Sequence, residues 1–395
     1  MNSLFNYLKL ILVFIFISPV LNASETEVTW AGVAFVSDKD TNKLYPYLSE
    51  QGFDNLNEWA LKALQQNSQM KNFKNFKIRV NDAGFPLEVD PKQAEGILMS
   101  VVFFADDTFF SKNISVKGNV TYDNTYQIYG SLLFFEFGNG AYINSIPLIQ
   151  QKVVEEFRVP DNKKILNNFS QMLRPSASNN YFIELFKQAQ NIKLNELPNK
   201  FVKFGEVKFG PSVESFFAKS NESDIWKFRI SKQYENELIK YSKFPLVPSG
   251  PNNEINQLRA VFEDASYEII LPEPTFVFNT KVSVFKKIDR PNKKKITKTI
   301  CHIVGLRLKF FDKSFGEAEE ELSVPFVRGK KSCGVIGINN EVDDQYFFPM
   351  NLITLIQNSS KQFRSIDNSY LKEATQGKEA NAIKQIKKVQ ELMEF

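Results

Sequence analysis

The fold of this chain is decided by the stretch Tyr126-Gln-Ile-Tyr-Gly-Ser-Leu-Leu-Phe-Phe-Glu136, which recurs as Cys301-His-Ile-Val-Gly-Leu-Arg-Leu-Lys-Phe-Phe-Asp312. A glycine-containing turn follows each stretch, and then comes Ser145-Ile-Pro-Leu-Ile149 in the first copy and Ser323-Val-Pro-Phe-Val327 in the second. Shared residue types in a shared order indicate two copies of one structural unit. Chance similarity between two apolar hairpins is the alternative, since the pairing needs small insertions.

Each copy predicts a β-hairpin, with a strand rich in aromatic and β-branched residues and a return strand whose proline marks a strand end or an edge. A helix is expected after each hairpin, over 161–173 with Asp161 as its N-cap, and over 350–363. The strands predicted to open the two halves are 28–36 and 202–209. Both halves therefore follow the order strand, helix, strands, hairpin, helix.

Tandem duplication predicts an α+β fold of two tandem related domains, each a mainly antiparallel sheet with helices packed on one face. The expected parts are a signal peptide over 1–23, domain one over 24–191, domain two over 192–365 and a charged helical tail over 366–395. The proline-rich stretch 245–256 is expected to be a loop inside domain two. Apolar residues recur every three positions in the tail, so we expect it to dock on its own domain. A tail that binds a partner is the alternative.

The N-terminus has the pattern of a secretory signal peptide. Lys9 precedes a largely apolar run over 10–20, and small Ala23 is followed by the polar residues 24–27. An uncleaved membrane anchor is the alternative. A lipid anchor would need a cysteine directly after the cleavage site, whereas the first cysteine is Cys301. We therefore expect an exported protein, periplasmic or secreted.

Charge and cysteine content narrow the function further. Lys and Arg number 49 against 45 Asp and Glu, a formal net charge of +4. Such a balance argues against a dedicated nucleic-acid binder, whose charge is usually strongly one-sided. Cys301 and Cys333 are the two cysteines, and in an oxidising compartment they predict a disulfide. Two buried free thiols are the alternative.

The sequence contains little recognisable chemistry. His302 is the single histidine, so zinc sites that need two histidines are excluded, and we expect it to be structural. The nucleophile elbow, the P-loop and the dinucleotide-binding glycine motif are absent. We expect no catalytic residue, no metal site and no cofactor.

Three weak matches are explained more simply by local structure. Ser68 and Lys71 have the spacing of a penicillin-binding motif, but its K-T-G partner is missing. The acids of Asp38 to Asn42 resemble the start of a calcium loop, whereas the required glycine is replaced by Lys43. The pairs Asp106-Asp107 and Asp343-Asp344 could perform acid–base work, but their neighbours predict turns at strand ends.

One local feature is strongly charged. Between residues 286 and 298, in the predicted hairpin loop of copy two, there are seven basic residues and one acid. The basic residues are Lys286, Lys287, Arg290, Lys293, Lys294, Lys295 and Lys298. The equivalent loop of copy one has only Lys112 and Lys117. We predict that this tip binds an anion, either acidic lipid head groups, a phosphorylated surface polymer or an acidic partner. A solvated strand connection is the alternative.

Together these patterns favour an exported, non-catalytic binding or assembly protein of the cell envelope. Its expected partner is a protein or an anionic envelope surface, with no nucleic acid, and an oligomer is possible. A secreted hydrolase that uses carboxylates alone, such as a glycosidase, remains an alternative because it needs neither histidine nor a linear motif. A structural subunit that pairs through sheet edges is a further alternative.

Overall fold

The computed structural model describes most of the chain. The described residues are 26–36, 44–66, 73–80, 96–114, 120–176, 180–194, 199–250, 257–263, 265–294, 296–314, 316, 318–329, 332–338 and 341–393. The predicted signal peptide, the calcium-like segment 38–42 and the Ser68/Lys71 motif lie outside them.

The first sheet has the strand order β5-β4-β3-β1-β8-β9, and β2 also pairs with β1. Its strands are β1 (Thr26–Val36), β2 (Phe76–Val80), β3 (Ile97–Ile114), β4 (Val120–Glu136), β5 (Tyr142–Glu156), β8 (Gln257–Val261) and β9 (Ser266–Ile270). The helices of the first half cover one face of this sheet, and they are α3 (Phe53–Gln66), α4 (Asn162–Leu173) and α5 (Tyr181–Ala189). A short 3₁₀ helix, η1 (Ser49–Gln51), precedes α3.

The second sheet has the order β12-β11-β10-β6-β7, with β13 paired to β11. Its strands are β6 (Val202–Phe209), β7 (Leu246–Val247), β10 (Phe276–Pro291), β11 (Thr297–Asp312), β12 (Glu319–Arg328) and β13 (Cys333–Gly337). Its helices are α6 (Pro211–Ala218), α7 (Ser223–Glu237), η2 (Ile239–Tyr241), α8 (Asp344–Lys361), α9 (Asn368–Ala374) and α10 (Glu379–Met393). These helices pack on one face of the sheet, as the α+β prediction requires.

The predicted duplication is visible in the strand pairing. A parallel pair, β1 with β3 or β6 with β10, is followed in each half by two antiparallel pairs. The register shifts at the same places, at Phe134/Phe135 in the first hairpin and at Phe310/Phe311 in the second. The Phe-Phe pair is therefore the structural marker of the repeat.

The two glycines of the repeat do not correspond. A bulge in the preceding strand lies opposite Tyr129/Gly130 in the first half and opposite Gly305/Leu306 in the second. Leu306 thus occupies the place of Gly130, and Gly305 occupies the place of Tyr129. Both glycines precede an apolar run in the sequence, but the two runs differ in length by one residue, and a shift of one residue in a strand reverses the face.

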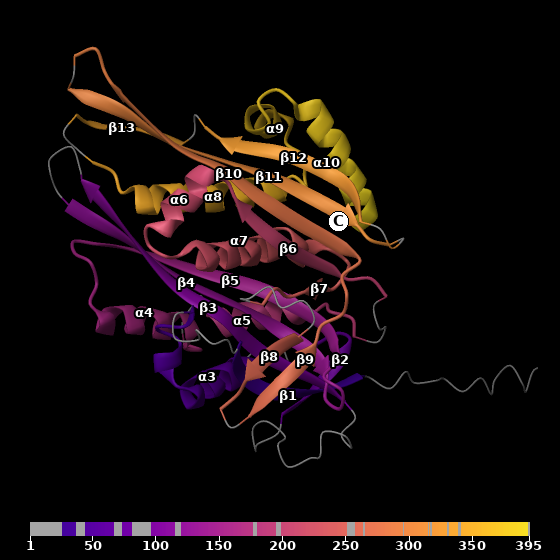
Figure 1. Ribbon diagram of the computed structural model, residues 1–395. Coiled ribbons are helices and arrows are strands. Elements are labelled where there is room, and N and C mark those ends of the chain that lie inside the picture. Colours follow the sequence, from indigo (N-terminus) through magenta and orange to yellow (C-terminus); the bar gives the residue numbers. More distant parts are fainter. Residues whose placement is uncertain are drawn as a thin grey trace, which may run out of the picture.

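The molecule is layered, with α7 between the two sheets (Figure 1). Trp226, Ile230 and Tyr234 of α7 belong to the core of the second sheet. Phe228 belongs to the core of the first sheet. Because α7 is buried from both sides, the first sheet is covered on both faces, by its own helices and by a helix of the second half.

Four details differ from the predictions. Helix α8 starts at Asp344 rather than at 350, since Pro349 lies inside it and a proline normally ends a predicted helix. Within 245–256, Leu246–Val247 forms β7 alongside β6. Strand β3 continues nine residues beyond its predicted end at Ala105, to Ile114. The hairpin β8–β9, from the second half of the chain, pairs with β1 of the first sheet.

The boundary between 191 and 192 stays a prediction, because strand pairing alone does not define independently folding units.

Two other local predictions are confirmed. Asp161 caps α4, accepting a hydrogen bond from the Lys164 amide at 2.8 Å. The tail forms α9 and α10, which pack against β12. Ile386 and Val389 of α10 are fully buried in the second core. The tail therefore docks on its own half of the molecule.

Candidate functional site

One face of the second sheet is left uncovered by the described helices. In β11 the even-numbered residues from Ile300 to Phe310 are buried, whereas most odd-numbered residues are partly or fully exposed. In β4, by contrast, an unbroken run of residues from Asn124 to Phe135 is buried. An antiparallel sheet can tolerate water on one face, so the second sheet presents an open face to solvent.

Three cations lie in a row across this open face. Lys281 of β10 is paired in register with Lys208 of β6 on one side and with Arg307 of β11 on the other. All three side chains are solvent-exposed. Like charges directly opposite each other destabilise a sheet, so stability alone does not account for this row.

Two further cations extend the row along β10 toward the hairpin end. Lys286 and Arg290 share the face of Lys281 beyond the bulge, and both are exposed. The neighbouring acids Glu206 and Glu320 are ion-paired with Lys208 and Lys309. Within the described part of the chain, Lys281, Lys286, Arg290 and Arg307 make no ion pair with a carboxylate. We call these four residues the basic face.

The seven predicted anion-binding residues are divided between the two sides of the hairpin. Lys286 and Arg290 lie on the basic face. Lys287 and Lys298 lie on the opposite side, ion-paired with Asp344 at 2.7 Å and with Asp289 at 3.4 Å. Lys293 and Lys294 are exposed at the turn, and Lys295 lies outside the described residues. Whether any of them binds an anion stays a prediction.

The predicted disulfide is present and lies in the same hairpin. Cys301 and Cys333 are bonded, with their Cα atoms 4.0 Å apart, and the bond joins β13 to β11. Val335 of β13 lies opposite Thr299 and is 69% exposed, and Ile296 at the turn is 64% exposed. The end of the hairpin therefore combines exposed aliphatic side chains with basic ones. Figure 1 shows that this end extends beyond α6 and α8.

His302 has a structural role, as the sequence predicts. Its side chain is 3% exposed, its Nε2 lies 2.8 Å from Asp344 Oδ1, and its ring stacks on Phe347. Burial alone would raise the pKa of Asp344, but hydrogen bonds from Lys287 and His302 hold it below its usual value. Asp343 caps α8 through the Gln345 amide. These contacts fasten the hairpin to the start of α8.

The turn predicted at Asp106-Asp107 is wrong. Both residues lie inside β3 and are buried, at 2% and 7% exposure. Burial raises the pKa of Asp106 to about 8, even though it accepts hydrogen bonds from the amides of Leu48 and Tyr47. Burial also raises the pKa of Asp107 to about 6, and Arg229 of α7 opposes this at 2.6 Å. Their neutralising partners come from distant segments, which the local sequence does not reveal.

The arrangement of the two aspartates is structural. Asp106 holds the segment around Leu48 on the outer side of the first sheet. Asp107 and Arg229 join the two halves of the molecule across the interface with α7. A second ion pair, between Lys232 and Glu235 at 2.8 Å, is also buried on α7. Neither aspartate lines either of two cavities in the described part of the chain.

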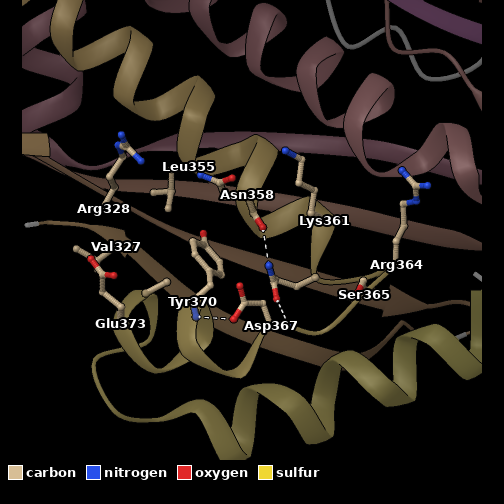
Figure 2. Close-up of a pocket in the computed structure, with 12 residues that line it drawn as sticks. Val327, Arg328, Leu355, Asn358, Lys361, Arg364, Ser365, Asp367, Tyr370 and Glu373 are labelled. Atoms are coloured by element: carbon tan, nitrogen blue, oxygen red, sulfur yellow. Dashed lines mark hydrogen bonds between the residues drawn. The ribbon is translucent and has the colours of Figure 1, made fainter. Parts of the chain in front are cut away.

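One of these cavities, of about 620 Å³, lies between α8, α9 and the end of β12 (Figure 2). The ring of Tyr370 stands within it, and its buried hydroxyl has no hydrogen-bond partner among the described residues. Arg328, whose Nε donates to Asn351 Oδ1 at 2.7 Å, forms one wall. Asp367 caps α9 through the Tyr370 amide, which fixes the ring in place. The lining contains side chains of both charges together with the buried hydroxyl of Tyr370.

In the described part of the chain, no group of three or more His, Cys, Asp or Glu side chains is arranged to hold a metal ion. No helix of that part has the length and apolar character needed to cross a membrane.

Comparison with known proteins leaves the family open. No family model and no curated protein matches the chain. Two similar solved structures are a Helicobacter pylori protein described as a neuraminyllactose-binding hemagglutinin homolog and the hypothetical protein CT253 from Chlamydia trachomatis. The first is 12% identical with a TM-score of 0.25, and the match covers 42% of this chain and 83% of that one. The second is 11% identical with a TM-score of 0.21, covering 49% and 98%. At such scores the resemblance carries no functional argument.

Proposed function

We propose that this protein is an exported, non-catalytic binding protein of the cell envelope that attaches to an anionic lipid surface through the basic face of its second sheet. The observation that carries the proposal is the row of cations on an uncovered sheet face, continued to the hairpin end by Lys286 and Arg290. Export is part of the proposal and rests on the N-terminal sequence pattern.

The chemistry of the face fits a lipid surface. Each Lys or Arg near an anionic membrane contributes about 1 kcal/mol, so the four residues of the basic face can supply several kcal/mol at low salt. The exposed Val335 and Ile296 at the hairpin end provide aliphatic groups for the head-group region. Because the charges are solvent-exposed, added salt weakens the attraction.

The test is sedimentation with vesicles of phosphatidylglycerol and phosphatidylcholine. In the test variant, Lys281, Lys286, Arg290 and Arg307 are each replaced by glutamine. We expect the parent to bind at low salt, and the variant to bind at least tenfold more weakly with an unchanged circular dichroism spectrum. The matched control replaces the exposed residues Lys163, Lys219, Lys384 and Lys387 by glutamine, which makes the same change of net charge elsewhere.

Two outcomes would contradict the proposed lipid partner. If test and control variants lose affinity equally, the attraction is due to net charge and not to the basic face. If the parent does not bind these vesicles but captures an acidic protein through the same residues, the lipid surface is the wrong partner. Mass spectrometry of the exported protein tests the compartment, because cleavage after Ala23 leaves Ser24 as the first residue.

A further inference from the structure

A second large cavity lies where the two halves of the molecule meet. Its volume is about 1060 Å³, and its walls come from the start of β5, the end of α5 and the segment from Ile239 to Leu246. Tyr142 and Ser145 both donate hydrogen bonds from their hydroxyls to the Leu246 carbonyl, which holds the two halves together at the base of this junction. The cavity does not include any residue of the basic face.

The ionisable side chains that line the cavity are mainly positively charged. Its lining contains one acid, Glu184, and four lysines, namely Lys193, Lys200, Lys240 and Lys243. Within the described residues, Lys193, Lys200 and Lys240 form no salt bridge. Unpaired cations that converge on a cavity favour an anionic ligand.

Aromatic rings accompany these cations. Lys200 Nζ lies 5.7 Å from the ring centre of Phe244, and Lys240 Nζ lies 5.0 Å from that of Tyr241. Tyr241 is 41% exposed, so part of its ring remains free to pack against a ligand. The ring and its cation are thus held together before any ligand arrives.

Amide side chains complete the lining. They are Asn144, Gln188, Asn191 and Asn199. Each offers hydrogen-bond donors and an acceptor, a combination that suits a ligand rich in hydroxyl groups. Neutral amides add little to the binding of a bare phosphate or sulfate, which is attracted mainly by charge.

We propose that this junction cavity binds an anionic sugar chain. The lysines pair with its carboxylate or sulfate groups, the amides bond its hydroxyls, and Tyr241 packs against the apolar face of a sugar ring. This site is separate from the proposed membrane-binding face and does not depend on it.

A chain fits better than a single sugar because the cavity does not end at Tyr241. The guanidinium of Arg364 lies 3.8 Å from the centre of the Tyr241 ring, and Arg364 lines the cavity of Figure 2. The two cavities therefore adjoin at this stacked pair. A chain that passes over the pair reaches Lys361.

The test is isothermal titration calorimetry with three hexasaccharides: a sulfated one derived from heparin, a carboxylated oligogalacturonate and neutral maltohexaose. We expect the parent to bind at least one acidic probe, and maltohexaose at least tenfold more weakly. The variant Lys200→Gln/Lys240→Gln should lose at least tenfold in affinity, and Tyr241→Leu about fivefold. The matched control, Lys163→Gln/Lys219→Gln, has the same net charge and should bind like the parent.

The outcomes separate this site from the basic face. Loss of affinity in the Lys200/Lys240 variant, with retention in the four-residue variant of the basic face, supports the junction cavity, and the preferred acidic probe identifies the anionic group. The reverse pattern overturns the inference, because the sugar would then bind to the open sheet. If maltohexaose binds as tightly as the acidic probes, the anionic groups have no role in binding. If no probe binds, the cavity is not a sugar-binding site.

Discussion

The two sheets of this molecule share one strand plan but differ in what covers them. Val102, Ser131 and Leu133 are fully or almost fully buried in the first sheet. The strand register places Lys281, Arg307 and Lys309 at the equivalent positions of the second sheet. Elements of the second half, among them α7 and β7, pack against the first sheet, whereas no described helix covers the second set. The difference in cover therefore accounts for which sheet has a polar surface.

The comparison also shows where charge is tolerated. In the first sheet, each buried charge has a partner from a distant segment, as Asp107 has in Arg229. In the second sheet, unpaired cations remain on the open face, where water solvates them. Substitutions at the buried ion pair of the first sheet should therefore lower the free energy of unfolding. Substitutions of the exposed cations on the second sheet should change binding alone.

The largest effect is expected from Arg229→Leu. Removing this guanidinium leaves Asp107 buried without its cation, and such changes typically cost about 3–5 kcal/mol of unfolding free energy. Urea unfolding at pH 8 measures it. Lys227→Leu on the same helix removes an exposed pair with Asp224 and should cost less than about 1 kcal/mol. Equal losses in the two variants would show that the interface does not depend on the buried pair.

The second sheet should depend on its disulfide. Replacing both Cys301 and Cys333 by alanine removes a cross-link between residues 32 positions apart, which should cost about 3–4 kcal/mol. Hydrogen exchange should then show faster exchange in β13 and the end of β11 and little change in the first sheet. If protection from hydrogen exchange falls equally in both sheets, the two halves unfold as one unit. The predicted difference between the two sheets would then be wrong.

The two repeat glycines differ in the space around them. A Cβ on Gly130 would lie 2.4 Å from the hydroxyl of buried Tyr181 and 2.9 Å from the Val102 carbonyl. Overpacking of this kind costs about 1–3 kcal/mol in Gly130→Ala. A Cβ on Gly305 would meet only Val284 closely, at 3.1 Å, so Gly305→Ala should cost less than about 1 kcal/mol. Thermal unfolding of both variants tests the contrast, and equal shifts would contradict it.

Stability should also change with pH, with opposite signs for the two sheets. The pKa of Asp106 in the first sheet is raised to about 8, so the folded state holds its proton more tightly than the unfolded state. Stability should therefore fall as pH rises from about 4 to 8, by at most about 1.4 kcal/mol per pH unit for one proton. The pKa of Asp344 is lowered, so its contribution is lost only as pH falls through the acidic range.

Urea unfolding between pH 4 and pH 9 measures this dependence. Asp106→Asn should reduce the fall in unfolding free energy above pH 6, where Asp107 has already lost its proton. Asp344→Asn should leave that decline unchanged. A decline that persists in Asp106→Asn would assign it to another group.

The sequence predicted the elements more successfully than the site. The hairpins, the cap at Asp161 and the disulfide depend on local patterns or on neighbouring strands, and all three are confirmed. The basic run between 286 and 298 indicated only part of the basic face. Lys281 and Arg307 were missed, although alternation of Arg307 and Lys309 with apolar residues was a signal that one face of this strand is exposed.

The buried aspartates could not be predicted in this way. Two adjacent acids usually indicate a turn, because strands rarely contain them. Here the amides of Tyr47 and Leu48 and the guanidinium of Arg229 compensate them. These partners are about 60 residues before and more than 100 residues after the pair in the chain, so no local window contains them.

By itself the sequence determined the repeated unit, because the periodicity of strands and helices and the capping of helix ends are local properties. Only the tertiary structure decided that α7 lies between the sheets, that β8–β9 joins the first sheet and that one face of the second sheet stays open. These features depend on which apolar surfaces meet when distant segments pack. The alternation in β11 indicates that one of its faces is polar, but the element that covers β4 comes from a distant part of the chain.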